Sequence, residues 1–166
     1  MKIMNKRDYE EKSLQRDFTL EIKQVEKEDR TIEFPFSSEL PVERYFGKEV
    51  LEHTRKAANL KRLNDGAPFL WNHSPDHVLG VVEKAYIDEK KKRGYAKVRF
   101  SEEEFADSKF RDVKNKILRN ISFGYVINKA EEVDNSIVAR DWEAFEVSLV
   151  SIPADNSIGI SRSIND

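Results

Sequence analysis

A histidine, a serine and a glutamate in this sequence have the side-chain types that nucleophilic catalysis by a hydroxyl group requires. His73 ends an apolar stretch and begins a polar turn, Ser122 lies in an alternating apolar stretch beside small residues, and Glu146 lies in a stretch that is otherwise mostly apolar. Such a trio supplies a general base, an oxygen nucleophile and a group that orients the base. Each residue also has an ordinary structural interpretation, as a turn histidine, a strand serine or a solvated glutamate.

The histidines also allow a metal-site interpretation. His73 and His77 have the spacing of a helical zinc motif, and Glu83 could be a third ligand. This spacing brings two rings to one face only in a helix, and Pro75 between them disfavours a helix. The metal interpretation is therefore weak, and no metal and no cofactor are expected. His53 is expected to be a surface or partly packed residue.

Composition excludes several classes of protein. The chain has 166 residues, 29 Lys+Arg, 31 Asp+Glu, a formal net charge of −2 and no cysteine. A near-zero charge argues against a dedicated nucleic-acid binder, so an RNA-binding module that uses the basic run 90–93 with Tyr86 and Tyr95 is the least favoured alternative. The lack of cysteine excludes a disulfide framework, a thiolate nucleophile and Cys-ligated zinc. No stretch approaches the roughly 20 apolar residues of a membrane helix, and no secretory signal begins the chain. These features predict a soluble intracellular protein.

The elements that must position the three candidate residues are mostly strands. Alternating apolar and polar residues, or short apolar runs between turn signals, predict strands at residues 18–23, 31–36, 67–73, 77–87, 94–100, 120–128, 137–140 and 142–152. The strand at 31–36 is expected to lie at an edge or to end at Pro35, which cannot donate a ladder hydrogen bond. A polar turn is predicted around Asp134 and Asn135. Residues 1–17 lack periodicity and are expected to form a mobile arm.

One long helix is predicted at residues 102–119. Its apolar residues follow the spacing of one helical face, so the residues expected to pack on the sheet are Ala106, Phe110, Val113 and Ile117. A short helix is also expected within residues 55–63, ended by residues 64–66. The whole pattern predicts one α+β domain with a mostly antiparallel sheet.

Three segments resemble the tailed-phage prohead protease family. They are residues 71–76 (WNHSPD) with Gly80 shortly after, residues 117–125 (ILRNISFGY) and residues 145–155 (FEVSLVSIPAD). Residues 38–51 are similar to the same family. Three segments in this order and spacing are specific where each alone is weak, and the resemblance covers approximately residues 30–163.

The resemblance implies a serine endopeptidase that cleaves scaffold protein and the N-terminal segments of capsid protein during procapsid maturation. It implies a prohead protease domain over residues 18–163, with a barrel-like sheet flanked by helices as in the herpesvirus assembly proteases. It implies a location inside the assembling procapsid in the cytoplasm of the bacterial host, and a homodimer is compatible with it. On the matched positions, Ser122 would be the nucleophile, His73 the general base and Glu146 the third member, where the herpesvirus enzymes have a second histidine.

Three alternatives remain at this stage. Asp141, Glu143 and Asp155 are rivals of Glu146 for the third position. A non-catalytic capsid-assembly or scaffold-like protein could also share the fold, and it would not need Ser122 and His73 to be in contact. A metal-dependent hydrolase is a further alternative, which bound zinc would support.

Overall fold

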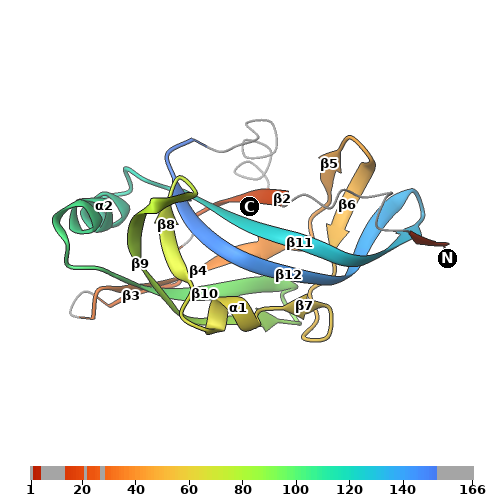
Figure 1. Ribbon diagram of the computed structural model, residues 1–166, viewed down its shortest axis with the longest axis horizontal. Helices are drawn as coiled ribbons and strands as arrows, with labels where there is room; N and C mark the ends of the chain where they lie inside the picture. The colour runs from red at the N-terminus through yellow and green to blue at the C-terminus, as the bar shows by residue number, and fades with distance from the viewer. Residues whose placement is uncertain (1, 5–13, 21, 27–28, 153–166) are drawn as a thin grey trace.

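Most of the molecule is a single curled sheet. The computed structural model describes residues 2–4, 14–20, 22–26 and 29–152 (Figure 1). Two short helices accompany twelve strands in this part of the chain. The strands are β1 (Lys2–Met4), β2 (Leu14–Thr19), β3 (Gln24–Glu26), β4 (Thr31–Ser38), β5 (Val42–Arg44), β6 (Gly47–Leu51), β7 (Ala58–Asn59), β8 (Pro68–Trp71), β9 (Ser74–Asp88), β10 (Arg93–Phe100), β11 (Asn120–Val133) and β12 (Ser136–Val150), and the helices are α1 (Lys61–Asn64) and α2 (Glu104–Lys114).

The sheet order shows that β12 is a central strand. The main path runs β1-β11-β12-β8-β9-β10-β4-β3, and β2 pairs with β11 beside β1. β12 pairs antiparallel with β11 but parallel with β6, β7 and β8. The other ladders are antiparallel, and the sheet curls into a half-barrel, as Figure 1 shows. The predicted α+β fold with a mostly antiparallel, barrel-like sheet is therefore confirmed.

The long β11–β12 hairpin crosses the whole sheet. Its two turn residues, Asp134 and Asn135, have φ angles of 47° and 65°, as a type I′ turn requires, and this turn matches the twist of paired strands. The predicted turn is confirmed. The strands predicted separately at residues 137–140 and 142–152 are one continuous strand, β12, because Asp141 pairs with Lys129 and the ladder passes Arg140 with only a register shift.

Helix α2 packs one apolar face on the sheet, but it is shorter than predicted. Ala106, Phe110 and Val113 are buried, and the Phe110 ring lies 4.8 Å from the Phe100 ring between centroids. The prediction that Ile117 packs on the sheet is wrong, because this residue is 70% exposed. The helix ends at Lys114, and Lys116 then adopts a φ of 61°, which turns the chain away from the helical path.

The residues immediately before position 18 are part of the sheet. β2 begins at Leu14, so residues 14–17, expected within the mobile arm, form a ladder with β11. Arg16 is 3% exposed, and its guanidinium binds the Glu49 carboxylate at 2.8 Å and the Tyr125 hydroxyl at 3.2 Å. This buried ion pair attaches β2 to the sheet although its sequence is polar.

Two smaller outcomes concern local elements: at Pro35, β4 is an edge among the described strands, as expected, and the short helix is smaller than predicted. β4 continues past Pro35, which lies beside a register shift of the β10–β4 ladder. Because β3 pairs only with residues 31–33, β4 pairs with β10 alone at this point among the described strands, so the proline needs no second ladder bond. The helix expected within residues 55–63 is reduced to the four residues of α1, and Ala58–Asn59 pair with β12 instead.

Candidate active site

His73 is presented by a tight turn between β8 and β9. Trp71 pairs with Ser74, so Asn72 and His73 are the two turn residues, and their φ angles are 50° and 60°. A left-handed conformation costs a non-glycine residue about 1–2 kcal/mol. The turn is held on β12, because the Asn72 N–H donates to the Leu149 carbonyl at 2.9 Å and the Ser151 N–H donates to the Asn72 side-chain oxygen at 3.0 Å. Such strain persists only where the surroundings fix it, and it is concentrated at functional sites.

The long hairpin brings the other two candidates to the same face of the sheet. Ser122 on β11 pairs with Ser148 on β12, and Gly124 pairs with Glu146. Directly opposite residues of an antiparallel ladder project to the same side. Ser122, Ser148 and Glu146 therefore face the His73 turn together, while their neighbours Phe123 and Val147 lie in the core.

The structure brings His73, Ser122 and Glu146 together in one chain of hydrogen bonds. His73 Nε2 lies 2.9 Å from Ser122 Oγ, and His73 Nδ1 contacts Glu146 Oε1. A carboxylate only accepts, so Nδ1 carries the proton and Nε2 is left to accept the serine hydroxyl. This tautomer allows the imidazole to take a proton from Ser122. The arrangement is therefore competent for general-base activation of an oxygen nucleophile.

Ser148 completes this network, although no functional role is predicted for it from the sequence. Its hydroxyl donates to Glu146 Oε2 at 2.8 Å and accepts the backbone N–H of His73 at 3.1 Å. Ser148 is two positions after Glu146 along a strand, with Val147 between them, so both side chains lie on one face. This spacing is the feature of the sequence that could have indicated a shared role for Ser148 and Glu146. It is informative only when the shared face is known to be polar and buried.

Gly124 provides the space that Glu146 occupies. A Cβ atom at this position would lie 2.7 Å from Cζ of Phe145 and 3.2 Å from Cγ of Glu146. Contacts this short require the neighbouring side chain to move. A larger residue at position 124 would therefore displace the carboxylate that binds His73.

The network is closed to solvent to different degrees. Ser122 and Ser148 are 0% exposed, Glu146 is 9% exposed, and the His73 side chain is 21% exposed. The low polarity of such surroundings strengthens the hydrogen bonds between these groups. Ser122 Oγ is covered in this conformation, so a substrate carbonyl needs an opening of the site to reach it.

The rival acids lie elsewhere or outside the described residues. Asp141 lines a charged surface hollow with Arg140 and Lys129, and Glu143 pairs with Arg62 at 3.5 Å. His73 has hydrogen bonds to Glu146, Ser122 and Ser148, and neither Asp141 nor Glu143 is among these partners within the described ranges. Asp155 lies beyond residue 152, outside the part of the chain that the structure describes.

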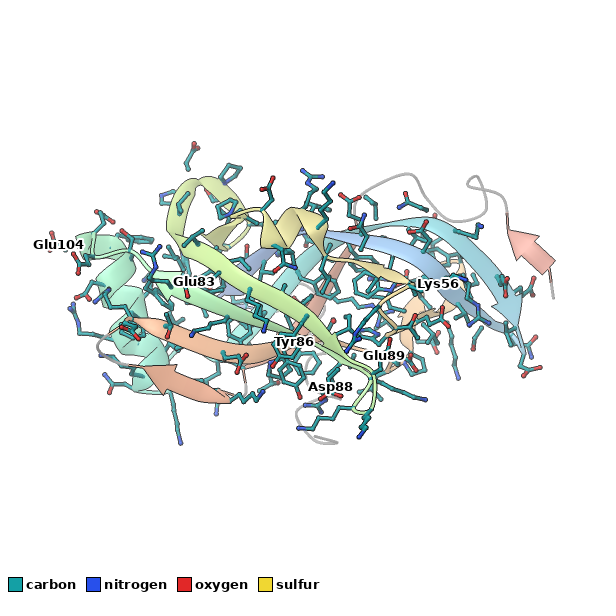
Figure 2. All side chains as sticks on the ribbon, turned by 90° about the horizontal axis from the view of Figure 1, so that it is seen from below. Lys56, Glu83, Tyr86, Asp88, Glu89 and Glu104 are labelled. Carbon is teal, nitrogen blue, oxygen red and sulfur yellow. The ribbon has the colours of Figure 1, made fainter. Side chains whose placement is uncertain are left out.

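The candidate zinc ligands do not converge. His77 is bonded through Nδ1 to the Ser74 hydroxyl at 2.9 Å, and Glu83, labelled on β9 in Figure 2, pairs with Arg99 at 2.7 Å. In residues 2–4, 14–20, 22–26 and 29–152, no three His, Asp or Glu side chains form a group that could hold a metal ion. Within the same ranges, no helix is long and apolar enough to cross a membrane.

A second serine–histidine pair is buried far from solvent. The expectation that His53 lies at the surface or is only partly packed is wrong, since this residue is 1% exposed. Its Nδ1–H donates to the Leu51 carbonyl at 2.7 Å, and its Nε2 accepts the Ser37 hydroxyl at 2.8 Å. Burial lowers the pKa of His53 to about 4. The partner of His53 Nδ1 is a backbone carbonyl where His73 has a carboxylate, and the His53 ring is buried whereas the His73 side chain is 21% exposed, so we interpret this pair as structural.

Known proteins similar to this chain are phage capsid proteins and a capsid protease. The family model described as Caudovirus prohead serine protease matches residues 19–165. The major capsid protein of Halomonas phage phiHAP-1 is 42% identical over 136 residues, which is 76% of this chain and 22% of that protein. The capsid polyprotein of Pseudomonas phage PAJU2 is 30% identical over 144 residues, or 82% of this chain and 20% of that protein.

A solved structure shares the fold at low sequence identity. The bacteriophage T4 capsid assembly protease gp21 matches with a TM-score of 0.57 and 11% identity, over 85% of this chain and 98% of that one. At this identity the likeness shows the fold alone. This chain spans about a fifth of the length of the two phage capsid relatives.

Proposed function

The chain belongs to the caudovirus prohead serine protease family, and we propose that Ser122, His73 and Glu146 are its catalytic triad. The observation that carries this proposal is the continuous contact from Ser122 Oγ through the His73 ring to Glu146. The strained turn under His73 and the space left by Gly124 support it, because both serve this contact.

The reaction follows from the positions of the protons. His73 Nε2 takes the hydroxyl proton as Ser122 Oγ attacks a peptide carbonyl carbon, and the proton is then given to the leaving amine. Water, deprotonated by the same nitrogen, releases the acyl group from Ser122. Glu146 holds the Nδ1–H and stabilises the imidazolium while it carries both protons. Hydrogen-bond donors for the developing oxyanion are also required.

We propose that capsid protein and scaffold protein are the substrates, inside the assembling procapsid in the host cytoplasm. Two relatives carry the names major capsid protein and capsid polyprotein, and a third is named a capsid assembly protease. A matching region that is about a fifth of each capsid relative is compatible with a protease domain carried on the same polypeptide as its substrate.

The test is cleavage of the capsid and scaffold partners by the full chain. Purified wild type, Ser122→Ala and Ser37→Ala are incubated with each partner, and new chain ends are identified by mass. Wild type and Ser37→Ala are expected to produce the same fragments, and Ser122→Ala none. Cleavage by Ser122→Ala at the wild-type rate would refute the triad. If no variant cleaves, the alternative of a non-catalytic capsid-assembly protein with this fold is favoured.

The same assay tests the third member. Glu146→Gln is expected to retain more activity than Ser122→Ala, because it removes orientation and charge but not the proton transfer itself. Asp141→Asn and Glu143→Gln are the matched controls, since each removes an acid from the same strand. Full activity of Glu146→Gln together with an inactive Asp141 or Glu143 variant would show that another acid fills the role.

A further inference from the structure

We infer that Ser148 is a positioning residue, which holds Glu146 and His73 in the geometry that general-base catalysis needs. The inference rests on the proposed function of the triad. Ser148 is distinguished from other strand serines by its partners, because its hydroxyl bonds to two members of the proposed triad at once.

The hydroxyl of Ser148 fixes the rotation of the Glu146 carboxylate. Oε1 of Glu146 contacts His73 Nδ1, and Oε2 accepts the Ser148 hydroxyl at 2.8 Å. With one oxygen held on each side, the carboxylate plane cannot turn away from the imidazole without breaking a bond. Hydrogen bonds to charged groups are stronger than those between neutral groups. Ser148 therefore keeps the acceptor aimed at Nδ1.

The hydroxyl oxygen of Ser148 also binds the backbone of His73. The His73 N–H donates to Ser148 Oγ at 3.1 Å, within a turn whose two residues both have positive φ. A buried N–H without an acceptor is costly, so this bond favours the strained conformation. Ser148 Oγ thus adds a third hydrogen bond that holds the His73 turn near β12, and it also directs the carboxylate of Glu146.

The hydrogen bonds of the Ser148 hydroxyl, rather than its burial, separate this role from substrate contact, because the hydroxyl is engaged by Glu146 and by the His73 backbone. Ser148 is 0% exposed and lies between Ser122 on β11 and Leu70 on β8. Its proton is given to Glu146, so it is not in a position to be the nucleophile. Removal of its hydroxyl is expected to lower kcat while KM stays unchanged, because no contact with the substrate is lost.

The test uses two substitutions of Ser148 and a matched control. Ser148→Ala is expected to lower kcat by about 10- to 100-fold, the size expected for loss of a hydrogen bond to a charged group. Ser148→Cys leaves no cavity and keeps a hydrogen on the side chain, but its larger sulfur is a weaker donor, so its kcat is expected to lie between those of Ala and wild type even if Ala loosens the core. Ser37→Ala is the control, because Ser37 is 2% exposed and bonded to the buried His53, outside the triad.

A double-mutant cycle tests whether Ser148 acts through Glu146. In the Glu146→Gln background, Ser148→Ala is expected to lower kcat by less than about 3-fold, since residues that act as a unit are not additive. An equal loss in both backgrounds, or a Ser148→Ala enzyme with wild-type kcat, would overturn the inference. With Ser122→Ala inactive and wild type active, that outcome leaves the proposed function standing.

A spectroscopic measurement decides the inference without activity. The proton on His73 Nδ1 is expected to give a strongly downfield resonance in wild type, because it is bonded to a carboxylate. Ser148→Ala is expected to shift or remove this resonance, and Ser37→Ala is expected to leave it in place. An unchanged resonance in Ser148→Ala would refute the role of Ser148, whether or not any variant cleaves the capsid partner. The absence of cleavage by every variant, including wild type, would separately refute the proposed function.

Discussion

Replacement of Gly124 by alanine should damage catalysis more than stability. The added Cβ would lie 2.7 Å from Cζ of Phe145 and 3.2 Å from Cγ of Glu146. The Phe145 ring is half-buried and can move outward, but the Glu146 carboxylate is held by His73 and Ser148. A shift of a few tenths of an ångström is therefore imposed on the Glu146 side chain, which in the proposed triad orients the general base.

The magnitude has two parts of opposite sign. Overpacking a filled site costs about 1–3 kcal/mol, whereas alanine in place of glycine within a strand recovers about 0.5–1 kcal/mol of chain entropy. The net loss of unfolding free energy is thus on the order of 1 kcal/mol. A misplacement of about 1 Å costs roughly 100-fold in rate, so a smaller shift of Glu146 should lower kcat by about 10-fold.

The assay pairs a urea melt with kcat on the capsid partner. Gly66→Ala is the matched control, because Gly66 has a φ of 72° with nothing within 4 Å of the added Cβ. Gly66→Ala is expected to lose about 1–2 kcal/mol of unfolding free energy because of the left-handed backbone, which is comparable to the loss in Gly124→Ala. It should nevertheless leave kcat unchanged. If Gly124→Ala keeps wild-type kcat, or if Gly66→Ala lowers kcat as much as Gly124→Ala does, the steric argument is wrong.

Three further predictions address the core, the triad and the pH dependence. His73→Ala should be about as inactive as Ser122→Ala, and the double variant no worse, since base and nucleophile act as a unit; additive losses in kcat/KM would contradict this. Phe110→Ala should cost about 3–5 kcal/mol in urea melts, against less than about 0.5 kcal/mol for Ile117→Ala, because the two residues are 1% and 70% exposed. His53 has its folded pKa lowered by burial to about 4 from 6.5, so the unfolded chain binds the extra proton. Stability should then fall as the pH drops from about 6.5 towards 4, by up to ~1.4 kcal/mol per pH unit, and His53→Gln should lack this slope in pH-dependent melts.

Local sequence signals predict the elements that surround the site better than their lateral order. The β11–β12 turn follows from Asp134 and Asn135 between alternating stretches, and the buried face of α2 follows from helical spacing. The parallel pairing of β12 with β6, β7 and β8 joins segments far apart in the chain, so no local pattern encodes it. Ile117 continues the helical spacing past the point where Lys116 turns the chain, which explains why periodicity alone misplaced it.

Buried polar side chains account for what the sequence does not reveal at the site and in β2. Arginine is a residue type usually found at the surface, and the burial of Arg16 depends on partners distant in the chain, among them Glu49 and Tyr125. The burial of His53 likewise depends on a partner distant in the chain, Ser37, and could not be predicted from the local sequence. Ser122, His73 and Glu146 are predicted as site residues through the resemblance of three segments to the prohead protease family. The three residue types alone occur together by chance in many proteins. Ser148 lies in one of those segments, but its role depends on the direction of one hydroxyl.

The complete burial of Ser122 separates two properties that are often measured as one. A small electrophile that acylates serine would react at a rate equal to the intrinsic reactivity of Oγ multiplied by the fraction of time in which the site is open. The labelling rate therefore reports the fraction of time in which the site is open, provided that the intrinsic reactivity of Oγ is constant. A substitution that loosens the packing over Oγ would be labelled faster even while it turns over substrate more slowly. Labelling alone would thus rank such a variant above wild type, although the proposed triad predicts slower turnover for it.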